Sequence, residues 1–468
     1  MKKSITRREF LSSTAIFSSA VVCASEPSIG TPGVKSKHNK RPNIIFVMSD
    51  QQRKTTLHCY GNNKVETPVL DGLAQRGVLF TSCYSTQPVC SPCRSSMVTG
   101  LFPSVTTVVE NNIPLPRDMF SWMRKLHDNG YKVCYIGKWH LGTEPVPGYL
   151  DRWRGFNTGW PHWVKNEPYY AQPGESDKAF RKNLKANPPK IPAVQSLKGK
   201  YRPDIETDYA IEFITENQDR PFVCWLSFYP PHTPKHAPEE NIARYRGKIE
   251  PEDQAIYHAM VNRLDENIGR VLKTLDKLGL RENTLVLFTS DHGENYPANW
   301  NHHHKRLCYD QSANVPLIIS WPGTLPEGKR IQNVFSIADL CPTILDLCGF
   351  DWPQYLHGRS AKKLIQGDAS GWHEDVFIQN SPYPTHKKSV DPSMRERCVV
   401  TDEWKLILNT SRPPELYNRH APDPDKDNVY ETPENQEVIQ DLVRRLAVWG
   451  KKTEDEITSK LIAQWFRI

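Results

Sequence analysis

Continuous apolar runs recur along this chain, and helical patterns separate them. The run at residues 42–48 contains almost no polar residues, which is typical of a strand buried on both faces of a sheet. Residues 251–280 carry apolar side chains at three- and four-residue steps, which predicts an amphipathic helix. Further strands are predicted at 78–80, 132–136, 221–228, 284–289 and 315–320, and further helices at 67–77, 118–129, 204–218 and 337–348. This alternation predicts an α/β fold with a large, mainly parallel or mixed sheet flanked by helices.

The pattern changes after about Asp351. Short apolar runs follow one another there, and a single long helix is predicted near the end; the runs are at 375–378, 397–400, 404–408 and 415–417, and the helix is at 433–451. This order favours a smaller antiparallel sheet with a helix. We therefore predict a main α/β domain over residues 41–355 and a C-terminal subdomain over residues 356–468. Residues 143–204 are irregular, and no element is assigned to them.

The first 24 residues are typical of an export signal. Arg7 and Arg8 precede an apolar stretch at residues 11–22, which is the pattern of a twin-arginine signal. The stretch is too short to span a bilayer, and no later segment reaches the roughly eighteen apolar residues that a span needs. Lipid attachment at Cys23 is the alternative, although Val22 is a poor residue before a lipidated cysteine. Residues 25–40 are predicted to form a tether, and the mature protein is predicted to be periplasmic.

The composition of the 468 residues, 38% hydrophobic and 24% charged, is that of a globular protein. The net charge of +7 is spread along the chain, without the basic run and interleaved aromatics of a nucleic-acid-binding segment. We therefore expect no nucleic-acid partner, whereas an anionic substrate suits the charge balance. The eleven cysteines lack the regular spacing of a disulfide scaffold.

Polar residues gather where the predicted strands end. These residues are Asp50, Gln51, Lys138, His140, His232, Asp291 and His292. In open α/β sheets the carboxyl ends of the strands carry the functional site. The oxygens of Asp50, Gln51 and Asp291 favour calcium or magnesium, while the nitrogen of His292 leaves zinc or manganese open. A divalent metal surrounded by cationic groups predicts a site for an anionic tetrahedral group, either sulfate or phosphate.

One stretch combines reactive residues with a cation. It reads Cys90-Ser91-Pro92-Cys93-Arg94 and continues to Thr99-Gly100. Arg94 lies four residues after Cys90 and can stabilise negative charge near that sulfur. The spacing of Cys90 and Cys93 is equally compatible with a redox pair or with half of a zinc site. The stretch alone does not decide among these interpretations.

Together with its surroundings, this stretch resembles the motif of type I sulfatases, in which the cysteine becomes formylglycine. The resemblance covers most of the chain, because residues 42–51, 67–71, 137–142, 231–232, 290–293, 315–317 and 404–417 all follow in the family's order. It implies an alkaline-phosphatase-like fold and a hydrolase of sulfuric esters. It also implies a formylglycine-generating maturase as partner. Export, together with the aromatic and basic region at residues 153–202, favours a sulfated saccharide as substrate.

The resemblance implies a role for each matching residue. Asp50, Gln51, Asp291, His292 and the modified Cys90 would hold one divalent metal, with calcium expected and magnesium as the alternative. Arg94 and Lys138 would stabilise the formylglycine, and His140 would take the proton from its second hydroxyl. His232 and Lys305 would bind sulfate oxygens and assist the departure of the alcohol.

The chain departs from the family pattern at Gln51 and Cys93. Gln51 stands where many members have a second aspartate, which lowers the negative charge of the metal site. Cys93 stands where serine or alanine is commoner, and its thiol would compete with Cys90 for a disulfide. The family's modification needs an accessible chain before or during folding, and a twin-arginine route exports the protein folded. We therefore expect Cys90 to be converted in the cytoplasm before export. The unusual run of His302, His303 and His304 before Lys305 is assigned to substrate binding, with a solvated loop as the alternative.

Two other functions are compatible with the sequence. A phosphonate or phosphate ester hydrolase on the same scaffold would share the metal site, and the Asp50–Gln51 pair occurs among such enzymes. Export favours a sulfated glycan over a cytoplasmic phosphodiester. The second alternative is a non-catalytic exported glycan-binding protein with an unconverted cysteine. The chain has the expected polar residues at the ends of its predicted strands, which argues against this alternative.

Overall fold

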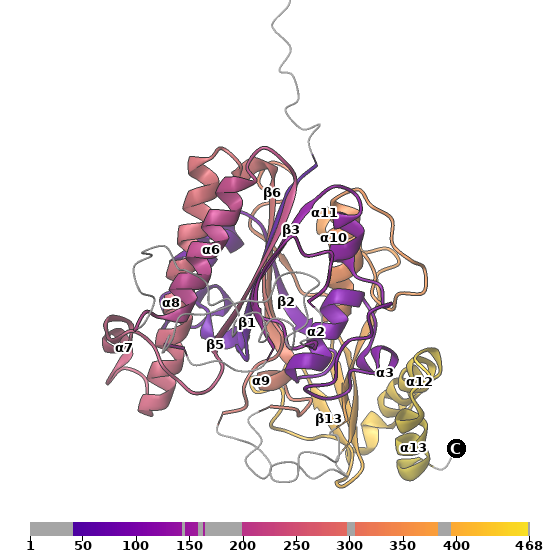
Figure 1. Ribbon diagram of the computed structural model, residues 1–468. Helices are drawn as coiled ribbons and strands as arrows, with labels where there is room; N and C mark the ends of the chain where they lie inside the picture. The colour runs from indigo at the N-terminus through magenta and orange to yellow at the C-terminus, as the bar shows by residue number, and fades with distance from the viewer. Residues whose placement is uncertain are drawn as a thin grey trace, which may run out of the picture. The chain divides into compact units, whose positions relative to one another are not determined.

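The computed structural model describes residues 41–142, 146–157, 162–163, 199–296, 305–381 and 395–466. The predicted export signal and tether lie outside these residues. Within them the strands form one sheet of nine strands and one of four (Figure 1). No helix in these ranges is long and apolar enough to cross a membrane.

The larger sheet has the strand order β4-β3-β5-β1-β6-β7-β2-β8, and β9 pairs with β2 beside this path. Its strands are β1 (Asn43–Asp50), β2 (Val78–Tyr84), β3 (Lys132–Lys138), β4 (Arg152–Phe156), β5 (Phe222–Pro231), β6 (Thr284–Ser290), β7 (Asn314–Ser320), β8 (Lys329–Ile331) and β9 (Phe335–Ser336). β7 runs antiparallel to both of its neighbours, β6 and β2, whereas the other neighbouring strands are parallel. The predicted large, mainly parallel or mixed sheet is confirmed.

Helices cover both faces of this sheet (Figure 1). Ile45 and Val47 of β1 lie on one face, against α1 (Pro68–Gln75), α6 (Arg202–Glu216) and α8 (Glu252–Lys277). Phe46 and Met48 lie on the other, against α2 (Cys90–Thr99), α4 (Trp122–His127), α10 (Leu340–Leu347) and α11 (Lys362–Gln366). Successive side chains of a strand point to opposite faces. Because both faces are covered, the sequence of β1 is apolar throughout.

Short helices occupy the connections between these elements. They are η1 (Lys54–Thr56), η2 (His58–Tyr60), α3 (Pro103–Thr106), α7 (Glu239–Tyr245), η3 (Arg281–Asn283), α9 (Asp310–Ala313) and η4 (Ile337–Asp339). The helix predicted at 118–129 begins only at Trp122, because the Ser121 hydroxyl accepts a hydrogen bond from the Arg124 amide and caps it there. The sequence did not predict β4, an edge strand whose five residues include Arg152 and Arg154 and therefore carry little apolar signal.

The smaller sheet is antiparallel, as predicted, and has the order β10-β11-β12-β13. Its strands are β10 (Asp375–Asn380), β11 (Glu396–Thr401), β12 (Trp404–Asn409) and β13 (Glu415–Asn418). Leu406 and Leu408 pack against α12 (Gln436–Lys452) and α13 (Glu456–Trp465), which η5 (Pro433–Asn435) precedes. On the opposite face Ile407 belongs to a cluster with Leu307 and Tyr309, two to four residues after Lys305. The domain boundary near residue 355 stays a prediction.

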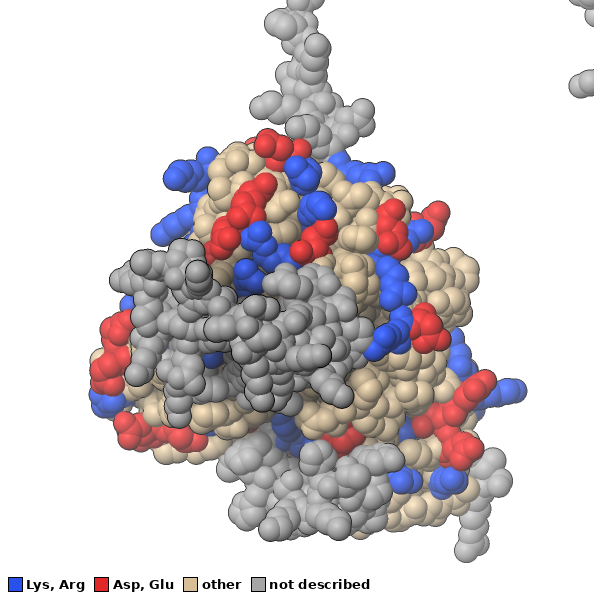
Figure 2. Space-filling model, in the orientation of Figure 1, with Lys and Arg blue, Asp and Glu red and all other residues tan. Residues whose placement is uncertain are grey.

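Charged side chains of both signs are interspersed over the face of the molecule that Figure 2 shows. Among the described residues of this face, the basic residues form no extended patch. This distribution matches a net charge of +7 that is spread along the sequence.

Candidate active site

Four neighbouring strands of the larger sheet deliver most of the predicted site residues. β3, β5, β1 and β6 lie side by side and run parallel, so that their carboxyl ends meet at one edge. β1 ends at Asp50 and β3 ends at Lys138, while His232 follows the last residue of β5. Asp291 and His292 follow β6 directly. The structure therefore brings these predicted residues together.

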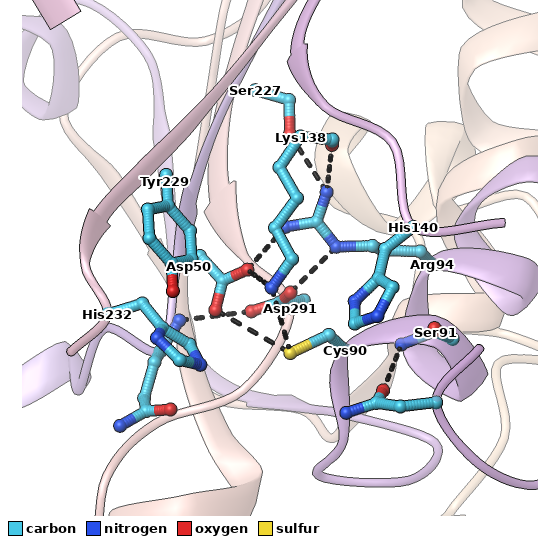
Figure 3. Close-up of polar contacts among 12 residues, drawn as sticks. Asp50, Cys90, Ser91, Arg94, Lys138, His140, Ser227, Tyr229, His232 and Asp291 are labelled. Atoms are coloured by element: carbon cyan, nitrogen blue, oxygen red, sulfur yellow. Dashed lines mark hydrogen bonds and ion pairs between the residues drawn. The ribbon is translucent and has the colours of Figure 1, made fainter. Parts of the chain in front are cut away.

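Cys90 is the first residue of α2, a helix whose ten residues are all buried. Its Sγ lies 3.1 Å from Nε2 of His292 and 3.7 Å from Oδ1 of Asp50. Figure 3 shows the thiol lying between the Asp50 and Asp291 carboxylates on one side and His140 on the other, with Lys138 reaching towards it. The amino end of a helix carries a partial positive charge, which favours an anion at this position.

The donor atoms of Asp50, Cys90, Asp291 and His292 lie within 4.8 Å of one another, and all four residues are buried. Gln51, the fifth predicted ligand, contacts a member of this group. Its backbone N–H donates to Oδ1 of Asp291 (3.1 Å), and its Nε2 donates to Oε1 of Glu294 (3.2 Å). The amide is thereby fixed, and its Oε1 is buried without a hydrogen-bond partner among the described residues. A buried carbonyl oxygen that lacks a hydrogen-bond partner is chemically compatible with a hard divalent cation.

Two buried cationic side chains form ion pairs with the carboxylates of the site. Arg94, 1% exposed, donates from Nη2 to Oδ2 of Asp50 and from Nε to Oδ2 of Asp291, both at 2.9 Å. Lys138 Nζ lies 2.6 Å from Oδ2 of Asp50 and 3.3 Å from Cys90 Sγ. Although burial and Cys90 oppose it, Lys138 and other nearby cations hold the pKa of Asp50 below its usual range. The carboxylate therefore stays ionised.

The Cys90 thiol is strongly acidified. Burial opposes its ionisation, but Lys138, Lys305 and His292 outweigh that effect and hold the pKa of Cys90 well below its usual value. Lys305 contributes through its Nζ, which lies 3.6 Å from Sγ. Position 90 is thus a place where the protein stabilises negative charge.

Two neutral imidazoles flank position 90. Burial, reinforced by Lys138, lowers the pKa of His140 to about 4, and its Nε2 lies 3.2 Å from Oδ1 of Asn112. Burial and then Lys305 lower the pKa of His232. His232 Nδ1 lies 2.7 Å from the carbonyl oxygen of Thr233, and its Nε2 lies 3.0 Å from Lys305 Nζ. Such groups can accept and deliver protons at neutral pH.

Comparison with known proteins identifies the family to which the chain belongs. A family model described as sulfatase matches residues 42–350. The chain belongs to the sulfatase family. A second model, described as N-sulphoglucosamine sulphohydrolase, C-terminal, matches residues 298–452 of this sulfatase. The protein is therefore a sulfuric ester hydrolase, and its family implies a metal and a formylglycine.

Relatives and solved structures extend over nearly the whole sulfatase. An ulvan-active sulfatase of Formosa agariphila is 28% identical over 449 residues, which cover 90% of this chain and 83% of the relative. An N-acetylglucosamine-6-O-sulfatase of Bacteroides thetaiotaomicron is 24% identical and covers 90% and 88%. A structure in complex with D-glucosamine-2-N,6-O-disulfate superposes with a TM-score of 0.76 at 22% identity, covering 89% of this chain and 99% of that one. A phosphonate monoester hydrolase of Agrobacterium radiobacter gives 0.70 at 22% identity, covering 88% and 96%. These two structures share the fold.

Two features singled out in the sequence have different outcomes in this sulfatase. His302, His303 and His304 lie outside the described residues, so their assignment to substrate binding stays a prediction. Cys93 is fully buried within the apolar core and does not belong to the metal-donor group found among the described residues. A zinc site built on Cys90 and Cys93 therefore has no support in this geometry.

Sequence reasoning missed several residues that shape the site. Ser227 Oγ accepts from Arg94 Nη1 (2.9 Å) and donates to the Lys138 carbonyl (2.8 Å). The Tyr229 ring stacks on His232, with centroids 4.8 Å apart, and Lys138 Nζ lies 5.1 Å from its centroid. Both residues fall within or just after the predicted strand at 221–228, but an apolar run does not show which of its side chains face a site.

Proposed function

We propose that this sulfatase removes sulfate from a sulfated carbohydrate, using a formylglycine made from Cys90 and one divalent metal. The observation that carries the proposal is the position of Cys90 Sγ, with metal-type donors on one side and Lys138 and Lys305 at 3.3 and 3.6 Å. An anionic tetrahedral group placed against position 90 would meet positive charge from several directions.

The proposed metal ligands are Asp50, Gln51, Asp291, His292 and position 90. Four of these five offer oxygen in the mature enzyme, which supports calcium, with magnesium as the alternative. When bound, the metal supplies positive charge that polarises the sulfate and stabilises charge on the attacking oxygen. Arg94 already neutralises one oxygen of each aspartate, so the protein part of the site carries little net negative charge.

A formylglycine at position 90 would supply a hydrated aldehyde, whose hydroxyl would be the nucleophile towards the sulfur of the ester. Arg94 and Lys138 keep the Asp50 and Asp291 carboxylates in place around position 90 and favour negative charge there. His140 is neutral near pH 7 and takes the proton of the second hydroxyl. Because His140 is buried beside Lys138, its imidazole stays uncharged before the reaction, and the two neighbouring residues do not both carry a positive charge.

Lys305 and His232 act together on the leaving alcohol. His232 Nδ1 donates to the Thr233 carbonyl, so its Nε2 carries a lone pair that accepts from the Lys305 ammonium. The pair thereby holds one proton between two nitrogens 3.0 Å apart. In the proposed reaction this proton passes to the departing oxygen, and the cationic charge before transfer binds sulfate oxygens.

The carbohydrate class of the substrate rests on three of the proteins compared above. Two are named as an ulvan-active sulfatase and an N-acetylglucosamine-6-O-sulfatase, and the third is solved with a disulfated glucosamine. We further propose that Cys90 is converted by a maturase in the cytoplasm and that the twin-arginine signal exports the folded enzyme to the periplasm. Lipid attachment at Cys23 is the less favoured form of the mature terminus.

The test is release of inorganic sulfate from a panel of saccharides with one sulfate at a defined position. An aryl sulfate, an aryl phosphonate monoester and an aryl phosphate diester serve as comparison substrates, and Cys90→Ala serves as the inactive control. We expect at least one sulfated saccharide to be hydrolysed faster than either phosphorus ester. A higher kcat/KM for the phosphonate or phosphate diester than for every sulfate ester would replace the proposal with phosphoryl chemistry.

A further inference from the structure

Three consecutive residues, Glu110, Asn111 and Asn112, contact three separate parts of the candidate active site. Glu110 forms an ion pair with Arg306, the neighbour of Lys305. Asn111 Oδ1 accepts a hydrogen bond from the backbone N–H of Ser91 (3.0 Å), the neighbour of Cys90. Asn112 Oδ1 lies 3.2 Å from Nε2 of His140. The connection between α3 and α4 that contains them was not recognised in the sequence.

The first two contacts hold this connection rigidly. The Arg306 guanidinium donates to both oxygens of Glu110, at 2.5 and 2.9 Å, and the two residues are 8% and 1% exposed. Bidentate pairs of this kind fix orientation as well as distance. The Asn111 backbone N–H also donates to Oε1 of Glu110 (2.7 Å). Asn112 therefore extends from an anchored segment.

The contact of Asn112 decides which nitrogen of His140 carries a proton. The amide oxygen of Asn112 is a hydrogen-bond acceptor, so Nε2 of His140 must be the donor. In a neutral imidazole only one nitrogen carries hydrogen. Nδ1 is then the lone-pair nitrogen, and it is buried without a hydrogen-bond partner among the described residues. The ring interacts with the Cys90 side chain, beside which Figure 3 places it.

Backbone geometry supports a fixed arrangement. His140 has φ 60° and Asn112 has φ 67°, both in the left-handed region. Among residues other than glycine, asparagine, aspartate and histidine are enriched there. His140 is 6% exposed, so its ring cannot turn to satisfy Nδ1 with bulk water.

We propose that Asn112 is a positioning residue, which holds His140 as the Nε2–H tautomer and so presents Nδ1 to position 90. This inference rests on the proposed function, in which His140 is the base. As the hydroxyl O–H bond at position 90 breaks and the N–H bond at Nδ1 forms, the freed electron pair re-forms the aldehyde C=O bond, and the C–O bond to the sulfate group breaks to release sulfate. In the resulting imidazolium the Nε2–H still donates to Asn112 Oδ1, and the Nδ1 proton passes to water before the next turnover.

The direct test is the tautomer of His140 in the mature, calcium-loaded, full-length protein. Histidine is labelled with ¹⁵N, and long-range proton–nitrogen correlations are recorded at mildly alkaline pH, with His140 assigned by comparison with His140→Gln. Asn112→Gly removes the acceptor, and Asn112→Asp keeps it; both residues tolerate the left-handed backbone. Thr107→Gly is the matched control, because Thr107 has φ 64° in the same connection and is exposed.

We expect an unprotonated Nδ1 and a protonated Nε2 in the wild type, in Asn112→Asp and in Thr107→Gly. In Asn112→Gly both ¹⁵N shifts should move towards their average. A protonated Nδ1 in the wild type, or an Asn112→Gly spectrum identical to that of Thr107→Gly, would overturn the proposal.

Kinetics give the second readout. Asn112→Gly should lower kcat about tenfold or more and leave KM within about twofold of the wild-type value. This loss is a part of the roughly 10²–10⁴-fold rate enhancement that a positioned base supplies. Asn112→Asp should recover most of this loss, and equal kcat values for Asn112→Gly and Thr107→Gly would count against the proposal. Wild-type protein that hydrolyses no sulfate ester would instead overturn the proposed function, while the ¹⁵N spectrum would still decide the Asn112–His140 hydrogen bond.

Discussion

Lys305 Nζ lies 3.0 Å from Nε2 of His232 and 3.6 Å from Sγ of Cys90. The two residues come from different parts of the chain, since His232 follows β5 and Lys305 precedes α9. The contact joins the Lys305 amino group to an imidazole whose pKa burial and Lys305 itself keep low. Such a pair is suited to hold one transferable proton.

Replacing Lys305 should therefore lower kcat/KM by an amount that depends on the leaving group of the substrate. Lys305→Met should reduce kcat/KM roughly 10²-fold or more for sugar sulfates, whose alkoxide needs a proton to depart. An aryl sulfate, whose phenolate leaves without help, should lose only about tenfold, from weaker sulfate binding. Steady-state kinetics on both substrates test this, with the exposed Lys64→Met as control. Equal losses on both substrates would mean that Lys305 binds sulfate but delivers no proton.

Gln51 should set the affinity of the metal site. Its Oε1 is buried without a hydrogen-bond partner among the described residues, and we propose it as a ligand. Gln51→Asp should therefore bind calcium at least about tenfold more tightly than Gln51→Asn, because the added charge strengthens binding. The two variants have equal length and differ in charge. Glu294→Gln should weaken binding, because it disturbs the hydrogen bond that fixes the Gln51 amide. Calorimetric titration with calcium and magnesium measures the affinity of each variant. Equal affinities for Gln51→Asp and Gln51→Asn would show that residue 51 is not a metal ligand.

His258, on α8 and away from the metal donors, should make the fold sensitive to acid. Burial lowers its pKa to about 4, and its Nδ1 donates to the Gln254 carbonyl (2.7 Å). In the unfolded chain its pKa is about 6.5, so between pH 6.5 and 4 the unfolded state binds the extra proton. The free energy of unfolding is therefore highest above pH 6.5 and falls as the pH drops, by about 3 kcal/mol for this residue.

Denaturant unfolding across that pH range provides the measurement. His258→Asn keeps an N–H donor for the Gln254 carbonyl but does not titrate. The stability of this variant should decline less than that of the wild type between pH 6.5 and 4, by about 3 kcal/mol. Parallel decline of the two proteins would show that His258 is protonated in the fold as readily as in the unfolded chain.

Cys93 should be dispensable for turnover, in contrast to Cys90. It is fully buried in the apolar core, and burial raises the pKa of its thiol, so it stays protonated. Cys93→Ala should keep kcat within about twofold and cost about 1 kcal/mol of stability through the small cavity it leaves. Sulfate release and thermal unfolding of Cys93→Ala measure both effects. A Cys93→Ala variant with correctly converted Cys90 but no turnover would contradict this assignment.

The sequence predicted the parts of the site that depend on strand topology. Asp50, Lys138, His232 and Asp291 follow apolar runs, and parallel strands place such residues at one edge. Contacts between loops have no comparable pattern. The approach of Asn112 to His140, for example, depends on an anchor between Glu110 and Arg306, which are far apart in sequence. The orientation of the Gln51 amide likewise depends on Glu294, a partner that no local signal identifies.

The central claim is that Cys90 is the precursor of the nucleophile. The measurement that tests it most directly is peptide mapping by mass spectrometry of the mature exported enzyme, with kcat determined on the same preparations. We predict an aldehyde in place of the Cys90 thiol, which reacts with a hydrazide probe, and a kcat proportional to the converted fraction. Full turnover by a preparation with only unmodified thiol at Cys90, or by Cys90→Ala, would contradict the account.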